Sequence, residues 1–167
     1  IDFDNTWYLK RQYPISYPKV DFVIENDNTQ FDIEDVTFHF YHAPGHVADA
    51  IFIIIPKLNI WIAGDYLSNI EIPIIDDNQS DYVSTIEKST YLLNNYKTIE
   101  LLVTGHGDVA HNRKEISKRI AEDKQYLDLV IQNKEKNNTA ELIAFIKNRN
   151  ENPKMIDVHN NNIIRIK

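Results

Sequence analysis

Residues 42–49 have the sequence HAPGHVAD and lie between two stretches with the periodicity of β-strands. Before them, apolar residues at 36, 38 and 40 alternate with polar ones, which predicts a half-buried strand. After them, residues 49–55 form a nearly continuous β-branched run that ends at Pro56, as expected for a strand covered on both faces. HAPGHVAD is therefore predicted to be a loop at the edge of a β-sheet.

Further strands are predicted on both sides of this loop. Apolar alternation and short apolar runs indicate strands at residues 20–24, 58–63 and 99–103, the second of them reached through a tight turn at Lys57. The tail is expected to add one more strand around Ile163 and Ile164. Residues 1–18 are rich in aromatic residues and interrupted by prolines, and we expect an irregular lead-in there.

Helical periodicity begins after Pro73. It predicts a helix over residues 80–95 with Ser80 as its N-cap, and a long helix that opens at a capping box in residues 112–115. A second capping box at residues 138–141 predicts a last helix that ends near Asn148. Strands followed by helices indicate a single α+β domain over residues 1–167, with one mixed sheet and helices on one of its faces.

Composition excludes several classes of function. The formal net charge of −7 argues against a nucleic-acid-binding surface and against docking on an anionic membrane. The absence of cysteine excludes disulfides, thiolate nucleophiles and cysteine-ligated zinc, and it suits a reducing compartment. The longest apolar run is too short to cross a bilayer, and no signal peptide is recognisable, so we expect a cytoplasmic location.

Glycine gives the sharpest local signal. Average usage of about 7% corresponds to roughly twelve glycines in a chain of this length. This chain has four, and each lies next to a candidate ligand: Gly45 before His46, Gly64 before Asp65, and Gly105 and Gly107 on either side of His106. Each of the three segments also follows a predicted strand, where polar residues converge at one edge of a sheet.

Two imidazoles and one carboxylate form a ligand set that suits zinc, with iron or manganese as weaker candidates. A bound ion would lower the pKa of its water to about 7, which would supply hydroxide for hydrolysis at neutral pH. A lone histidine is more often a surface or core residue, and a lone Gly-Asp is usually a turn. The combination of His46, Asp65 and His106 nevertheless predicts a metal site.

Two neighbours are weaker candidates. His42 precedes His46 by four residues, and its ring is expected either to hydrogen-bond to a metal ligand and orient it, or to pack at the strand end. Asp49 is expected either to turn the chain or to orient His46 through its backbone. The sequence does not indicate which residues would bind a substrate.

The three motifs HAPGHVAD (42–49), WIAGD (61–65) and VTGHG (103–107) together resemble the second half of the metallo-β-lactamase superfamily, over residues 35–130. The resemblance implies half of an αββα sandwich with a dinuclear site at one edge. It also implies that His46 ligates one metal, that His106 ligates the other, and that Asp65 bridges them.

The first signature of that family, His-x-His-x-Asp-His, has no counterpart in this sequence. The chain is therefore expected to be the C-terminal half of a longer enzyme or a naturally shortened relative, inactive alone, with one zinc ion or none. The resemblance implies a parent hydrolase that attacks a small ester, thioester or lactone-like molecule through a metal-bound hydroxide. The alternative is a non-catalytic module with a vestigial metal site. A half sandwich would expose apolar surface, so we expect a homodimer or pairing with the missing N-terminal half.

Overall fold

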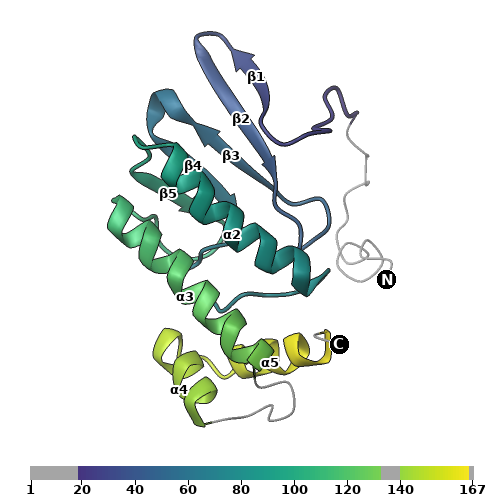
Figure 1. Cartoon of the computed structure of the whole chain (residues 1–167), viewed down its shortest axis with the longest axis vertical. Coiled ribbons are helices and arrows are strands. Elements are labelled where there is room, and N and C mark those ends of the chain that lie inside the picture. Colours follow the sequence, from purple (N-terminus) through teal and green to yellow (C-terminus); the bar gives the residue numbers. More distant parts are fainter. Residues whose placement is uncertain (1–18, 133–139, 166–167) are drawn as a thin grey trace, which may run out of the picture.

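The computed structural model describes residues 19–132 and 140–165, which form one mixed sheet and four α-helices (Figure 1). The strands are β1 (Thr29–Ile33), β2 (Val36–His42), β3 (Ile51–Ile55), β4 (Ile60–Gly64) and β5 (Leu101–Thr104). The helices are α2 (Gln79–Asn95), α3 (Arg113–Gln132), α4 (Ala140–Arg149) and α5 (Lys154–Arg165), and a 3-10 turn, Pro56–Leu58, joins β3 to β4. The α+β prediction is confirmed.

The sheet has the order β1-β2-β3-β4-β5. The first four strands are neighbours in sequence and pair antiparallel, whereas β4 and β5 pair in parallel. A parallel pair needs a crossover, and the segment that contains α2 supplies it. The carboxyl ends of β4 and β5 therefore meet at the same edge of the sheet, as the motif spacing predicts.

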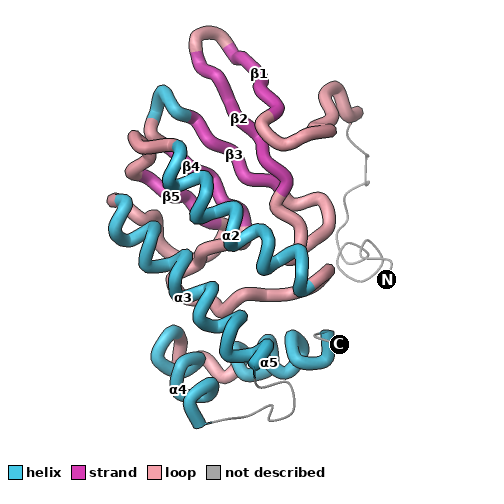
Figure 2. The backbone as a smooth tube through the Cα atoms, viewed as in Figure 1, coloured by secondary structure: helices cyan, strands magenta, loops and turns pink. Residues whose placement is uncertain are grey.

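The two faces of the sheet differ in burial. Figures 1 and 2 show α2 and α3 running across one face. Side chains that point toward these helices are fully buried, among them Phe52, Ile54, Trp61 and Leu102. Their neighbours along the strands are only half-buried: Ile51, Ile53, Ile60, Ile62, Leu101 and Val103. The prediction of helices on one face is thus confirmed for the described part of the chain.

Helices α4 and α5 lie beyond the sheet, next to the C-terminal half of α3 (Figure 1). The prediction of a strand around Ile163 and Ile164 is wrong, because these residues belong to α5. Met155, His159 and Asn162 are buried at a spacing of four and three residues, so the buried face of the tail has helical rather than strand periodicity.

Two other sequence predictions are corrected. Residues 20–24 are not a strand, and Val20, Phe22 and Val23 are exposed there. The alternation of apolar and polar residues was not sufficient, because a β-strand also needs a neighbouring strand to which its backbone can hydrogen-bond. The N-cap of α2 is Asn78 rather than Ser80, since the Asn78 side chain accepts from the backbone N–H groups of Ser80 and Asp81.

The remaining elements agree with the periodicity of the sequence. Strands were predicted at residues 36–40, 49–55, 58–63 and 99–103, and β2 to β5 occupy these positions. Asn112 caps α3 as predicted, with its Oδ1 accepting from the Glu115 N–H at 2.9 Å. The predicted lead-in at residues 1–18 lies outside the described residues, as do the first two residues of the capping box at 138–141. None of the described helices is long and apolar enough to cross a membrane.

Candidate metal centre

His46 lies in the loop between β2 and β3, and its backbone is fixed on two sides. Its N–H donates to the Tyr66 hydroxyl at 2.8 Å, and its carbonyl accepts from the Asp76 N–H at 3.1 Å. Burial raises the pKa of Tyr66, so this hydroxyl stays a neutral phenol that also contacts the Ala43 carbonyl at 2.7 Å. The loop conformation is therefore set by contacts from the segments that follow β4.

Gly45 allows the loop to approach helix α2. Its φ is +119°, and a Cβ built on it would lie 2.3 Å from the backbone nitrogen of Tyr82. Backbone atoms cannot move away as a flexible side chain would, so a side chain at this position would displace the loop or the helix. The glycine before His46 is thus required by close packing as well as by its φ.

The His46 ring has a defined tautomer. Its Nδ1 lies 2.8 Å from the carbonyl oxygen of Ile74. A carbonyl oxygen only accepts, so Nδ1 carries the hydrogen, and in the neutral ring Nε2 is left with a free lone pair. A ligand histidine that donates its other ring N–H to a carbonyl is a common arrangement at metal sites.

Asp65 and His106 follow the carboxyl ends of β4 and β5, and the parallel pairing of these strands brings them together. The Gly105 N–H donates to the Gly64 carbonyl at 2.7 Å, which ties the two ligand loops by their backbones. A Cβ at Gly105 would lie 2.1 Å from Asp65 Oδ1. The glycine before His106 therefore leaves room for the Asp65 carboxylate.

The three predicted ligands come together with Asp65 in the middle. His46 Nε2 lies 3.3 Å from Asp65 Oδ2, and His106 Nε2 lies 3.7 Å from Asp65 Oδ1. Each imidazole thus faces a different oxygen of the same carboxylate. His46 is mostly buried, whereas the His106 side chain is 54% exposed and remains open to further ligands.

The donor set fits a metal, although it is incomplete. Two ligands of a tetrahedral zinc, each about 2.0–2.1 Å from the ion, lie about 3.3–3.4 Å apart, close to the distance between His46 and Asp65. In the neutral tautomer His46 Nε2 and Asp65 Oδ2 are two acceptors that repel unless a cation or a proton lies between them. Among the described residues, no three His, Asp or Glu side chains are arranged to hold one ion together. The two imidazoles therefore face separate oxygens of Asp65 and do not converge on one point.

Glu71 is a candidate that the sequence did not reveal. Its Oε1 lies 4.0 Å from His106 Nδ1, on the side of the ring away from Asp65. It stands between Ile70 and Ile72 with no neighbouring glycine, so no local pattern marks it. Its position places a second carboxylate near the His106 ring.

The two weaker candidates lie elsewhere. The His42 ring contacts the Ile24 carbonyl at 2.8 Å and is 3.8 Å from Asp27 Oδ1, so it faces the segment before β1. Asp49 is exposed in the turn that leads into β3. The structure thus gives His42 a contact at the strand end and places Asp49 in a turn.

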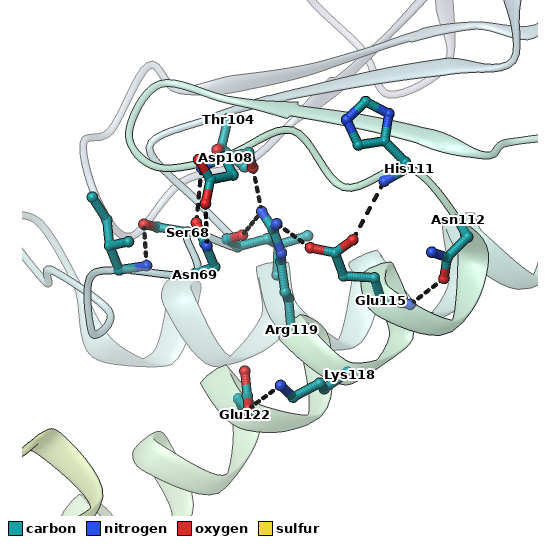
Figure 3. Close-up of polar contacts among 12 residues, drawn as sticks. Ser68, Asn69, Thr104, Asp108, His111, Asn112, Glu115, Lys118, Arg119 and Glu122 are labelled. Atoms are coloured by element: carbon teal, nitrogen blue, oxygen red, sulfur yellow. Dashed lines mark hydrogen bonds and ion pairs between the residues drawn. The ribbon is translucent and has the colours of Figure 1, made fainter. Parts of the chain in front are cut away.

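A polar network joins the loops behind the ligands, as Figure 3 shows around Arg119. The buried Arg119 guanidinium donates to the carbonyl oxygen of Asp108, two residues after His106, at 2.7 Å, and its other Nη contacts Glu115. The Asn69 side chain accepts from the Asp108 N–H at 2.8 Å and donates to the Asp108 carboxylate at 3.0 Å. This network holds the loop after Asp65 against the loop after His106.

Asp123 and Arg149 form a buried ion pair beneath this network, 2.6 Å apart. Burial raises the pKa of Asp123 to about 6, and the attraction of Arg149 and the Leu67 N–H opposes that rise. Arg149 also donates to the Ser68 carbonyl. The pair anchors the chain just after Asp65 to α3 and α4.

Two solved structures share the fold at low sequence identity. A stereoselective inverting sec-alkylsulfatase from Pseudomonas sp. aligns with a TM-score of 0.58 and 14% identity, over 72% of this chain and 20% of the sulfatase. A rubredoxin oxygen:oxidoreductase from Desulfovibrio gigas aligns with a TM-score of 0.51 and 12% identity, over 67% of this chain and 33% of that protein. The chain thus spans a third or less of the length of these two proteins.

A comparison with curated proteins gave no match. A family model described as the metallo-beta-lactamase superfamily matches residues 2–123, which include all three ligand motifs. The resemblance inferred from those motifs is therefore confirmed, and the chain belongs to the metallo-beta-lactamase superfamily.

Proposed function

We propose that this chain supplies half of a dinuclear metal centre in a hydrolase, with His46 and His106 as ligands of separate ions and Asp65 as the bridge. The observation that carries the proposal is the pair of imidazole Nε2 atoms facing the two oxygens of one carboxylate, at 3.3 and 3.7 Å. Zinc is the proposed ion, because imidazole and carboxylate ligands suit it and the chain has no thiolate to offer. Ions bound there would supply Lewis-acid activation of water and of the substrate.

The residues of the chain have separate tasks in this proposal. The Ile74 carbonyl holds the hydrogen of His46 on Nδ1, which keeps Nε2 free to bind. The Glu71 carboxylate lies 4.0 Å from Nδ1 of His106, beyond hydrogen-bond distance, and contributes a negative charge on that side of the ring. Asp65 contributes both oxygens and is held in place by the Gly64–Gly105 backbone contact. None of these residues has to carry a proton during the reaction, so the proton acceptor and the substrate contacts would come from elsewhere.

The substrate class is proposed to be a small ester, thioester or lactone-like molecule. The net charge of −7 disfavours a polyanionic nucleic acid as substrate. The fold does not narrow the choice further, because the similar structures include both a sulfatase and an oxidoreductase. The residues that select a substrate are proposed to lie mainly outside this chain.

The metal site is tested by the zinc content of the purified chain after zinc loading and desalting. We expect about one zinc per chain in the wild type, and a reduced zinc content in both His46→Ala and His106→Ala, because each variant removes the imidazole that shares an ion with Asp65. His111→Ala is the matched control, since His111 is exposed and lies outside the ligand set. Zinc retention by both ligand variants, or none in the wild type, would contradict an assembled half-site.

Hydrolysis is tested on the longest natural reading frame that contains this sequence, loaded with zinc and assayed on esters, thioesters and lactones. We expect turnover that is lost on chelation and in Asp65→Asn, which removes one oxygen of the bridge. Zinc binding without turnover of any of these substrates would favour the non-catalytic module instead.

The proposed partner is a second copy of the chain or the missing N-terminal half. The half-buried isoleucines of β3 and β4 form an apolar surface opposite α2 and α3. An apolar surface of several strands is normally covered in soluble proteins.

A further inference from the structure

Helices α4 and α5 lie outside the residues 2–123 that the family model matches, yet they contact the segments that support the metal site. Figure 1 shows them packed beside the end of α3, away from the sheet. Near the predicted ligands, hydrogen bonds from α5 reach residues 73–76, which include the Ile74 partner of His46, and a hydrogen bond from α4 reaches Ser68, which follows Asp65.

Asn162 makes the central contact from α5. This residue is 1% exposed, and its side-chain Oδ1 accepts from the Ile75 N–H at 2.9 Å. Its Nδ2 donates to the Pro73 carbonyl at 2.6 Å and to the Tyr126 hydroxyl at 2.9 Å. An N–H on one side and a carbonyl on the other define the orientation of the amide.

Ile74 lies between the two backbone groups that Asn162 holds. Its carbonyl is the group that accepts from His46 Nδ1 at 2.8 Å. The Asn162 amide thus holds the Pro73 carbonyl and the Ile75 N–H. The Ile74 carbonyl belongs to the same planar peptide unit as the Ile75 N–H, so its direction is fixed as well. Asn162 reaches the His46 ring through this carbonyl without touching the ring itself.

We propose that Asn162 is a positioning residue for the metal site, which sets the tautomer and the direction of the His46 ring through the Ile74 carbonyl. The proposal rests on the proposed function in that His46 is taken as a metal ligand. Helix α4 contacts the other loop, where Arg149 donates to the Ser68 carbonyl three residues after Asp65. The C-terminal helices are therefore part of the framework of the metal centre.

The test uses the 167-residue chain with Asn162→Leu, which keeps the volume of the side chain and removes all three hydrogen bonds, and Asn162→Ala. The matched control is Asn161→Ala, because Asn161 is the neighbouring asparagine on the exposed face of α5. The first measurement is the tautomer of each histidine in the metal-free chain, from the 15N shifts of the ring nitrogens. The second is zinc affinity by competition with a chelating dye.

We expect the wild type and Asn161→Ala to show His46 with the hydrogen on Nδ1. In the Asn162 variants, His46 should become a mixture of tautomers while His106 stays unchanged, and zinc affinity should fall on the order of 10- to 100-fold. A purely structural role for Asn162 would lower thermal stability without changing the His46 tautomer. That result in a folded variant would overturn the proposal.

The two hypotheses fail in different ways. If the wild type binds no zinc but the His46 tautomer depends on Asn162, the metal site is wrong and the positioning contact stands. If zinc binds with the same affinity in Asn162→Leu, the positioning role is wrong and the metal site stands. Should neither variant fold, hydrogen exchange of the wild type decides the question, because a rapidly exchanging Ile75 amide would exclude the contact with Asn162.

Discussion

Gly45 and His46 are adjacent, yet different parts of the molecule constrain them. Gly45 meets the backbone of α2 at Tyr82, and His46 meets the Ile74 carbonyl and the Tyr66 hydroxyl. A change at Gly45 therefore acts on the ligand through the position of the loop. A change at His46 removes the ligand and leaves the loop intact.

The close approach of Gly45 to α2 leads to a prediction at the scale of the residue. Gly45→Ala should lower the free energy of unfolding by about 3 kcal/mol, because the new Cβ would need both a strained φ and a shift of the Tyr82 backbone. Gly64→Ala is the control, since Gly64 also has a positive φ of 57° but nothing lies within 4 Å of its Cβ position. It should cost about 1 kcal/mol. Equal costs in urea denaturation would show that the contact with Tyr82 is not tight.

At the scale of the element, the start of α2 is tied to the same loop. The Asp77 and Asn78 N–H groups both donate to the Gly45 carbonyl, at 3.2 and 3.3 Å, and the Asn78 side chain caps the helix. The N-cap of α2 and the residue before it therefore support the segment that carries His46.

Replacing the cap tests which residue begins the helix. Asn78→Ala should lower the free energy of unfolding by about 1 kcal/mol, because the Ser80 and Asp81 N–H groups lose their acceptor. Ser80→Ala should change it by a few tenths of a kcal/mol at most, since Ser80 is already inside the helix and its side chain is exposed. Chemical denaturation measures both, and a larger effect at Ser80 would contradict the observed cap.

At the scale of the whole molecule, the two faces of the sheet have different roles. One face packs on α2 and α3 and contains the buried core. The other carries half-buried isoleucines, with Ile53 paired to Ile62 across β3 and β4. The proposed association would use this second face.

Association is measured by sedimentation velocity at micromolar concentrations. We expect the wild type to sediment as a dimer, and Ile53→Lys to sediment as a monomer without unfolding, because a charge would be buried in the interface. Tyr91→Lys is the control, since Tyr91 is an exposed residue of α2. A wild-type chain that is a compact monomer, or a dimer that tolerates Ile53→Lys, would count against a sheet-to-sheet interface.

The sequence determined the features that depend on neighbouring residues. Periodicity predicted β2 to β5, α2 and α3, because one face of each is buried and that face recurs every two or every 3.6 residues. Glycines drew attention to His46, Asp65 and His106, and the structure brings these three side chains together, since Gly45 and Gly105 leave room for close neighbours. Periodicity was misleading in two places. Residues 20–24 alternate but pair with no described strand, and the residues around Ile163 belong to a helix that packs on the rest of the fold.

Only the tertiary structure decided which groups support the predicted ligands. Ile74 acts through its carbonyl, which has no side-chain signature, and Asn162 lies 116 positions after His46 in the chain. Glu71 and Arg119 likewise resemble ordinary surface charges until packing brings them to the ligand loops. A ligand is recognisable from its own residue type and neighbours, whereas its supporting contacts depend on distances across the fold that no local pattern contains.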